Sequence, residues 1–209
     1  KFTKIDNGLP ELKRTDKQIS RNELGIEENA FVLCLVSRGI PEKGWAEGIR
    51  AVEAAEKRCG RPIHLIILGD GDIRKELEKN VSPNIHFMGI KYNTRDYFLI
   101  SDVGFLPSRF PGESYPLVVA DSLICEKPVI ATDIAEVHNQ LKDENGDLAG
   151  KLIPINNWII DEKEMENMII ELAENKEEYQ LLKSRTVSAS GKFNITNVVF
   201  KFLEIYGNC

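Results

Sequence analysis

The sequence predicts an α/β fold, a Rossmann-like doubly wound parallel sheet with helices on both faces and added helices at the C-terminal end. Two observations support this fold class. Short, nearly continuous apolar runs alternate with amphipathic stretches through the middle of the chain, and such runs are typical of strands covered on both faces. The alternation also has the pitch of strand–helix–strand units, which join parallel strands by right-handed crossovers.

Six segments are predicted as strands because they are short, rich in apolar or β-branched residues, and bounded by Gly, Pro or Asp. We expect them to form one sheet. The predicted strands are 31–37, 63–69, 85–89, 103–108, 128–133 and a short last one at 151–154.

Four helices are predicted between these strands from apolar residues at helical spacing. From residue 161 onward the chain is predicted to be helical, whereas residues 1–30 are polar and turn-rich with one short helix. The apolar residues that mark the four helices are Trp45, Ile49 and Val52, then Ile73, Leu77 and Val81, then Tyr97 and Ile100, and finally Leu117, Ala120, Leu123 and Ile124.

The composition is that of a globular protein and disfavours two functional classes. The 209 residues are 42% apolar and 29% charged, enough to bury a core of their own. There are 27 basic and 33 acidic residues, and the net charge of −6 disfavours a nucleic-acid-binding protein. No apolar run approaches the ~20 residues of a membrane span. The chain opens on Lys1 rather than Met, as we expect of a processed or truncated protein.

Cysteines and histidines give no sign of a metal or redox site. The four cysteines form no C-x-x-C pair, and Cys34 and Cys125 fall in apolar runs, as core residues of a protein in a reducing cytoplasm would. His64, His86 and His138 are scattered, without metal-ligand spacing or a nucleophilic partner. We therefore assign no histidine a catalytic role.

The loop after the first predicted strand carries two cations. Arg38 and Lys43 lie five positions apart beside glycines in the segment 37–44. This pair suits a diphosphate, because the Arg fork can bind two oxygens while Lys adds a point charge. On spacing alone, an ordinary solvated turn is the better interpretation.

The segment 107–121 contains a Pro/Gly loop followed by a predicted helix that begins near Tyr115–Pro116, with Ser114 as its N-cap. Glu113 stands just outside the helix, and Asp121 lies about two turns further in. The first free amides and the helix dipole form an anion site. Alternatively, Glu113 only complements the dipole and Asp121 is a solvated helix residue.

A third loop, Gly69-Asp70-Gly71, begins like a dinucleotide fingerprint. Arg74 stands where the third glycine is required, and the loop follows the second predicted strand rather than the first. NAD or FAD binding is therefore not supported, and we expect a tight strand-to-helix turn.

Taken together, these segments resemble the C-terminal, nucleotide-sugar-binding half of a retaining GT-B glycosyltransferase of the "glycosyl transferases group 1" family. Each match is weak alone, but seven in the right order are specific. The matching segments are 5–8 (V-x-N-G), 37–44 (G-R-x-x-x-x-K-G), 68–71 (L-G-x-G), 87–89 (F-x-G), 101–103 (A-D-V), 107–117 (P-S…E-G-F-P-L) and 127–132 (G-x-P-V-I-A-T).

The resemblance implies catalytic roles for three side chains and a binding role for the residues around them. Arg38 and Lys43 would hold the donor diphosphate and stabilise charge on the departing nucleotide. Glu113, the first acid of the family's E-x7-E motif, would face the donor sugar near its anomeric centre. Ile90 and Lys91 would line the base pocket, largely through their backbone.

The resemblance also assigns the predicted helix to the donor. Asp121 replaces the second Glu of the motif and would bind ribose hydroxyls with a side chain one methylene shorter. Sugar hydroxyls and phosphate would be contacted by backbone groups of Ser114, Tyr115, Pro116, Leu117 and Val118.

The implied whole protein is a metal-independent enzyme that moves a sugar from a nucleoside-diphosphate sugar, such as a UDP- or GDP-sugar, to a glycan or lipid-linked acceptor. It would need no cofactor. Residues 1–10 would be an interdomain linker, 11–193 the nucleotide-sugar domain, and 194–209 a helix that packs toward an absent N-terminal acceptor domain. The implied setting is bacterial surface polysaccharide synthesis in the cytoplasm, with peripheral association at the inner face of the membrane. Alone, this piece would bind nucleotide weakly and not turn over.

Two other interpretations remain open. A non-catalytic Rossmann-like nucleotide-binding or scaffolding module is best supported by the Asp at position 121. A non-hydrolysing sugar-nucleotide epimerase ranks third, because the acid and His constellation it needs is missing.

Overall fold

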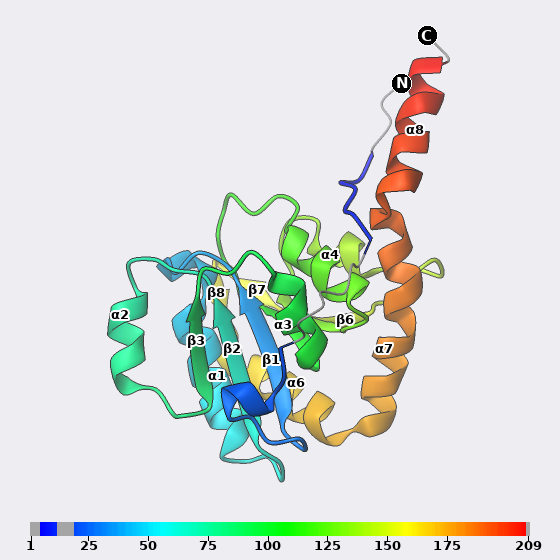
Figure 1. Cartoon of the computed structure of the whole chain (residues 1–209). Coiled ribbons are helices and arrows are strands. Elements are labelled where there is room, and N and C mark those ends of the chain that lie inside the picture. The colour runs from blue at the N-terminus through cyan, green and yellow to red at the C-terminus, as the bar shows by residue number, and fades with distance from the viewer. Residues whose placement is uncertain (1–4, 12–18, 208–209) are drawn as a thin grey trace.

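The computed structural model describes residues 5–11 and 19–207, so the predicted linker lies only partly within it. A six-stranded sheet with the order β3-β2-β1-β4-β5-β6 forms its centre (Figure 1). All neighbouring strands in it are parallel. The six predicted strands are confirmed, with ends displaced by at most two residues. They are β1 (Phe31–Val36), β2 (Ile63–Leu68), β3 (Ile85–Gly89), β4 (Val103–Leu106), β5 (Val129–Thr132) and β6 (Gly150–Ile153).

Helices cover both faces of the sheet, as the sequence predicts. Strand residues alternate between the two faces: Leu33 and Leu35 of β1 pack with α1 and α6, whereas Cys34 packs with α3. The opposite end of that second face is filled by α4 and α5, with α7 packed against α4. These helices are α1 (Trp45–Glu56), α3 (Thr94–Ile100), α4 (Leu117–Ile124), α5 (Val137–Leu141), α6 (Glu162–Glu174) and α7 (Lys176–Ser190).

The segment after residue 161 is helical, and two of its helices begin at side-chain caps. Asp161 accepts a hydrogen bond from the amide of Glu164 at 2.9 Å, and Asn175 accepts one from the amide of Glu178 at 3.0 Å. Such caps satisfy amides that have no partner within the helix.

Short elements account for the differences from the sequence-based prediction. The helix expected around Ile73 to Val81 is only α2 (Arg74–Leu77) with a 3₁₀ turn η3 (Glu78–Asn80), because Val81 is already extended. A small hairpin, β7 (Ile155–Asn156) with β8 (Ile159–Ile160), was not predicted, since two-residue strands carry no periodicity and the turn holds Asn157 and Trp158 instead of glycine. The remaining 3₁₀ turns are η1 (Asn22–Leu24), η2 (Pro41–Lys43) and η4 (Gly191–Phe193).

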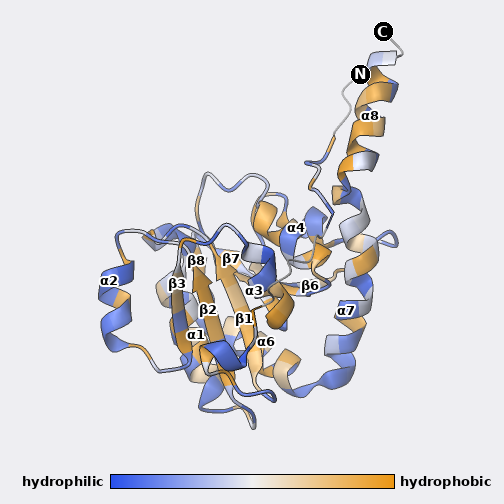
Figure 2. Ribbon diagram, viewed as in Figure 1, coloured by the Kyte–Doolittle hydropathy of each residue, from blue (hydrophilic) through white to orange (hydrophobic). Residues whose placement is uncertain are grey.

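The last helix, α8 (Ile195–Gly207), projects away from the body of the molecule, and much of its surface is hydrophobic (Figures 1 and 2). At its base it meets the segment 5–11. The amide of Leu9 donates to the carbonyl oxygen of Phe193 at 2.7 Å, and the amide of Ile195 donates to the carbonyl oxygen of Leu9 at 3.2 Å. The exposed apolar side chains of α8 are Ile195, Val199, Phe200, Phe202, Leu203 and Tyr206.

Two cysteines are core residues, as expected. Cys34 and Cys125 are buried free thiols, and burial raises the pKa of Cys34 above its usual range and that of Cys125 to about 12. Among the described residues, no helix is both long and apolar enough to cross a bilayer.

Candidate functional site

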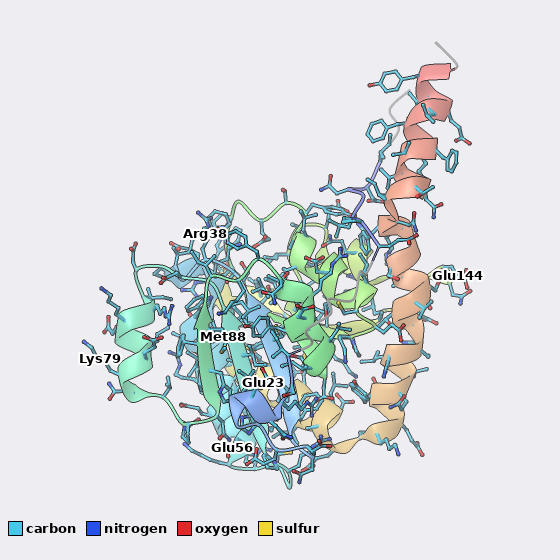
Figure 3. All side chains as sticks on the ribbon, viewed as in Figure 1. Glu23, Arg38, Glu56, Lys79, Met88 and Glu144 are labelled. Carbon is cyan, nitrogen blue, oxygen red and sulfur yellow. The ribbon has the colours of Figure 1, made fainter. Side chains whose placement is uncertain are left out.

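The site lies at the carboxyl edge of the sheet, beside the central strands β1 and β4. The chain order reverses here: β2 follows β1 on one side, whereas β4 pairs with β1 on the other. Loops that follow neighbouring strands at such a switch point diverge and leave room for a ligand. Figure 3 shows Arg38 at this edge, with Glu56 at the opposite end of the sheet.

A buried tryptophan, Trp45, anchors the loop after β1 by a hydrogen bond. Trp45 is fully buried at the start of α1, and its indole Nε1 donates to the hydroxyl of Ser37 at 2.8 Å. Between them the chain forms η2 and turns at Gly44, whose φ is 72°. This turn places Lys43 inward, with only 8% of its surface exposed.

The loop after β2 interlocks with the loop after β1 through their backbones. The amide of Gly39 donates to the carbonyl oxygen of Asp70 at 2.8 Å. The amide of Ile73 in turn donates to the carbonyl oxygen of Gly39 at 3.2 Å. A β-carbon on Gly71 would lie 2.3 Å from the carbonyl oxygen of Gly39. Gly71 thus serves a close approach between loops, in the tight turn that the sequence predicts.

The structure brings Arg38, Lys43 and Glu113 together. The Lys43 ammonium lies 2.5 Å from Glu113 Oε2, and the Ser108 hydroxyl donates to the same oxygen at 3.0 Å. Both side chains of the ion pair are nearly buried, at 10% and 11% exposed. Phe110 lies under both cations, its ring centroid 4.7 Å from Lys43 Nζ and 5.2 Å from Arg38 Cζ.

A cavity of about 260 Å³ opens next to Arg38 at the ends of β1 and β2. Ile90 and Lys91, which follow β3, line it together with Arg38, so three of the sequence-predicted site residues share one hollow. Its other lining residues are Val36, Ser37, Leu68, Gly69 and Asp70.

The expected cap of α4 is wrong. The helix begins at Leu117 with Pro116 in the capping position and no side-chain capping bond, so Ser114 is not the N-cap. The reason is local: Pro restricts the residue before it to extended conformations, so Tyr115 cannot be helical. Pro116 has no amide hydrogen, and the amide of Val119 already donates to the carbonyl oxygen of Pro116 at 3.1 Å. Of the residues 114–118, which were predicted to bind through their backbone, Leu117 and Val118 are therefore the ones whose amides lie at the start of the helix.

Tyr115 is directed toward the base of α8 rather than into the cavity. Its ring packs edge-on against Phe193 with the centroids 6.3 Å apart. Burial and the nearby Asp6 carboxylate raise the pKa of Tyr115 above its usual range. Any contact of Tyr115 with the donor is thus confined to its backbone.

Asp121 is held in an ion pair that sequence reasoning missed. Its Oδ1 accepts a hydrogen bond from Nε of Arg95 on α3 at 2.7 Å. The side chains of Asp121 and Arg95 are 22% and 18% exposed, so the solvated-residue interpretation of Asp121 is wrong.

Ser108 and Phe110 were also missed as members of the site. Ser108 is fully buried, and its hydroxyl both donates to Glu113 and accepts from the amide of Phe110 at 3.2 Å. A serine next to a proline at a strand end was the available signal for the first. An aromatic residue in an otherwise Pro/Gly loop was the signal for the second.

The arrangement is suited to an anion with several oxygens. Among the described residues Arg38 has no carboxylate within ion-pair distance, so its N–H donors are available to an anion at the cavity that it lines. Lys43 shares its charge with Glu113, and Lys91 adds a third cation. In the described part of the chain, no three His, Cys, Asp or Glu side chains gather as metal ligands do.

The family described as "Glycosyl transferases group 1" matches this chain over residues 16–186. An uncharacterised glycosyltransferase of Methanocaldococcus jannaschii is 27% identical over 198 residues, covering 91% of this chain and 51% of that protein. The alpha-D-kanosaminyltransferase of Streptomyces kanamyceticus is 27% identical over 145 residues, covering 64% and 36%. The chain therefore spans about half the length, or less, of these relatives.

Solved structures show the same fold. Anabaena HepE in complex with UDP has a TM-score of 0.76 at 22% identity, over 90% of this chain and 51% of that one. The pneumococcal O-GlcNAc transferase GtfA in complex with UDP and GlcNAc has a TM-score of 0.71 at 18% identity, over 85% and 35%. The fold is thus one Rossmann-like half of a GT-B architecture.

Proposed function

Because this chain belongs to the glycosyl transferases group 1 family, we propose that it is the donor-binding half of a retaining, metal-independent glycosyltransferase. Its donor is a nucleoside-diphosphate sugar, and its acceptor is a glycan or a lipid-linked sugar. The observation that carries this proposal is the gathering of Arg38 and the Lys43–Glu113 ion pair around Phe110, with Arg38 also lining a cavity.

The charges of the site match the needs of glycosyl transfer. As the bond to the sugar breaks, the leaving diphosphate gains negative charge. Fixed cations and amides aimed at that charge lower the barrier without reorganisation. Arg38 binds the diphosphate through its fork and Lys43 through its ammonium. Together they supply the positive charge that a metal ion supplies in other enzymes.

Glu113 is the acid nearest to these cations, and we assign it to the donor sugar. Lys43 and Ser108 together hold its Oε2, which leaves its other oxygen for the ligand. A carboxylate held in this position suits a sugar centre that becomes positively charged in the transition state.

The nucleoside is assigned to the cavity beside Arg38. Backbone groups of Ile90 and Lys91 face the base, and Asp121 binds the ribose through the acceptor sites that Arg95 leaves open. UDP is the first nucleotide to test, since two solved relatives of the same fold hold it.

The acceptor site belongs to a preceding domain in this proposal, with residues 1–10 as linker, 11–193 as donor domain and 194–209 as the helix that reaches back. The exposed apolar side chains of α8 support it, because a helix face of that kind needs a partner. Ile90, Tyr92 and Leu117 are also exposed, near the carboxyl edge of the sheet, on the side where an acceptor domain would close. For the setting, the sequence resemblance supports bacterial surface polysaccharide synthesis.

One specific observation favours the rival function, a non-catalytic nucleotide-binding or scaffolding module. Asp121 is already occupied by Arg95, and a carboxylate committed to a structural ion pair is less available to a ribose. A module of this kind has no reason to prefer one nucleotide.

Titration calorimetry of UDP, GDP and ADP against the 209-residue chain separates the two functions. We expect one nucleotide to bind in preference to the others and to raise the melting temperature by mass action. Arg38→Ala should weaken that binding, whereas Lys79→Ala, in η3 on the outer side of the molecule (Figure 3), should not. Equal or absent binding of all three nucleotides would favour the scaffold.

A further inference from the structure

Arg95 joins three separate parts of the molecule through one guanidinium group. Its Nε donates to Asp121 on α4 at 2.7 Å. Its Nη1 donates to the carbonyl oxygens of Pro10 at 2.7 Å and Glu11 at 3.3 Å. A side chain of α3 therefore links the donor-site helix to the backbone of the N-terminal segment.

That segment is bonded in turn to the start of α8. Besides the two backbone hydrogen bonds between Leu9 and the residues Phe193 and Ile195, the side-chain Nδ2 of Asn194 donates to the Glu11 carboxylate at 3.5 Å. We call residues 9–11 and 193–195 the junction. Under the proposed function, the chain passes through the junction each time it crosses between the two domains.

Packing adds a second contact between the donor helix and the junction. The ring of Tyr115 touches Phe193, and Leu9 packs against the same apolar cluster as Val119 of α4. Packing of this kind tolerates small shifts. The fork of Arg95 does not, because its donors lie in one rigid plane and each must meet its acceptor.

We infer that Arg95 is a positioning residue that couples the donor site to the junction. The inference rests on the proposed function, in which Asp121 binds the donor ribose. A ribose bound to Asp121 restricts that carboxylate, the restricted carboxylate restricts Arg95, and Arg95 then holds the carbonyl groups of Pro10 and Glu11. Because coupling between two sites is reciprocal, an ordered junction also strengthens donor binding.

Hydrogen exchange tests this coupling at the amides of Leu9 and Ile195, both bonded within the junction. The nucleotide is whichever of UDP, GDP and ADP binds the unmodified chain most tightly, at saturation. In the unmodified chain it should slow exchange at both amides by about fivefold or more, the lower end of typical coupling. In Arg95→Ala, nucleotide should still bind, several-fold more weakly, and leave both exchange rates unchanged.

Arg50→Ala is the matched control, because Arg50 also pairs with a carboxylate of another helix, Glu162, but far from the junction. It should keep the full protection by nucleotide. Asp121→Asn is the second variant in case Arg95→Ala fails to fold. It keeps the side-chain shape and should likewise abolish the protection.

The outcomes separate this inference from the proposed function. Equal nucleotide-dependent protection in the unmodified chain and in Arg95→Ala, or nucleotide binding without any protection, overturns the coupling alone. If none of the three nucleotides binds the unmodified chain, the proposed function fails and the coupling with it.

Discussion

Gly44 and Pro107 meet backbone to backbone: a β-carbon on Gly44 would lie 1.8 Å from the carbonyl oxygen of Pro107. Gly44 ends the loop that follows β1, and Pro107 begins the loop that follows β4. Their contact holds the two loops at the distance at which Lys43 reaches Glu113. The geometry of the candidate site therefore depends on a residue without a side chain.

Gly44→Ala should be one of the most destabilising substitutions in the chain. The backbone at Gly44 has a φ of 72°, which costs about 1–2 kcal/mol for a residue with a β-carbon, and the clash with Pro107 adds to it. We expect a loss of at least about 3 kcal/mol in urea unfolding. Gly25→Ala is the control, because Gly25 has a φ of 68° with no atom near the β-carbon position, and it should lose only the backbone cost. Equal losses in the two variants would contradict the close contact.

Lys43→Met should destabilise the protein because it leaves the Glu113 carboxylate nearly buried without a cation. Breaking a buried pair on one side costs about 3–5 kcal/mol, whereas replacing both partners is often close to neutral. The double variant Lys43→Met with Glu113→Gln should therefore recover most of the stability. The check is a double-mutant cycle in urea, and additive losses would show that the pair contributes no coupling energy.

Phe110→Leu should weaken nucleotide binding by about two- to fivefold, because the ring that orders Arg38 and Lys43 contributes about 0.5–1 kcal/mol. Calorimetry at constant ionic strength measures this loss. Phe200→Leu, on the exposed side of α8, should leave the affinity unchanged. A loss of the same size in both variants would point to a general effect of the substitution.

Acid should destabilise the fold through the group of Glu27, His64 and His86. Nδ1 of His64 lies 2.8 Å from Nε2 of His86, and Nε2 of His64 lies 2.7 Å from Oε2 of Glu27. Burial, and then the neighbouring His64, lower the pKa of His86 below 6.5. The unfolded chain thus binds this proton more readily, so stability is highest above about pH 6.5 and falls as the pH drops through that value.

Glu27 acts in the same direction at lower pH. A backbone hydrogen bond, and then the hydrogen bond with His64, lower the pKa of Glu27 below 4.5, so its stabilising effect is present above that value and lost below it.

Melting curves between pH 7.5 and 5 test the effect of His86 and are expected to show a midpoint that falls as the pH falls. His86→Phe should flatten that fall, while His138→Phe, an exposed histidine near Asp133, should not. An unchanged slope in His86→Phe would show that other groups govern the acid response.

The strands and the meeting of Lys43 with Glu113 were predictable from the sequence because both depend on the sheet. Apolar runs define the strands, and the loops after parallel strands share one edge. The Ser114 cap was wrong although the sequence held the correcting signal, since Pro116 excludes a helix that includes Tyr115. Arg95 was not predictable, because its contact with Asp121 depends on how two helices pack.

The histidine group shows the same limit at the other end of the sheet. His64 and His86 begin neighbouring strands, yet only the register of β2 against β3 places their rings in a stack with centroids 5.1 Å apart. Glu27 reaches them from a turn-rich segment without periodicity. No local pattern in the sequence indicates that these three residues meet.

The strand order has a consequence for how such a protein changes over generations. The ion pair of Lys43 with Glu113 is carried by the loops after the two innermost strands, β1 and β4, whereas the cavity residues Ile90 and Lys91 follow β3 at the outer margin. Insertions and exchanges are tolerated best at a margin. Under the proposed function, preference for one base over another can therefore be changed by replacing the few residues after β3, while the charge pair at the centre stays intact.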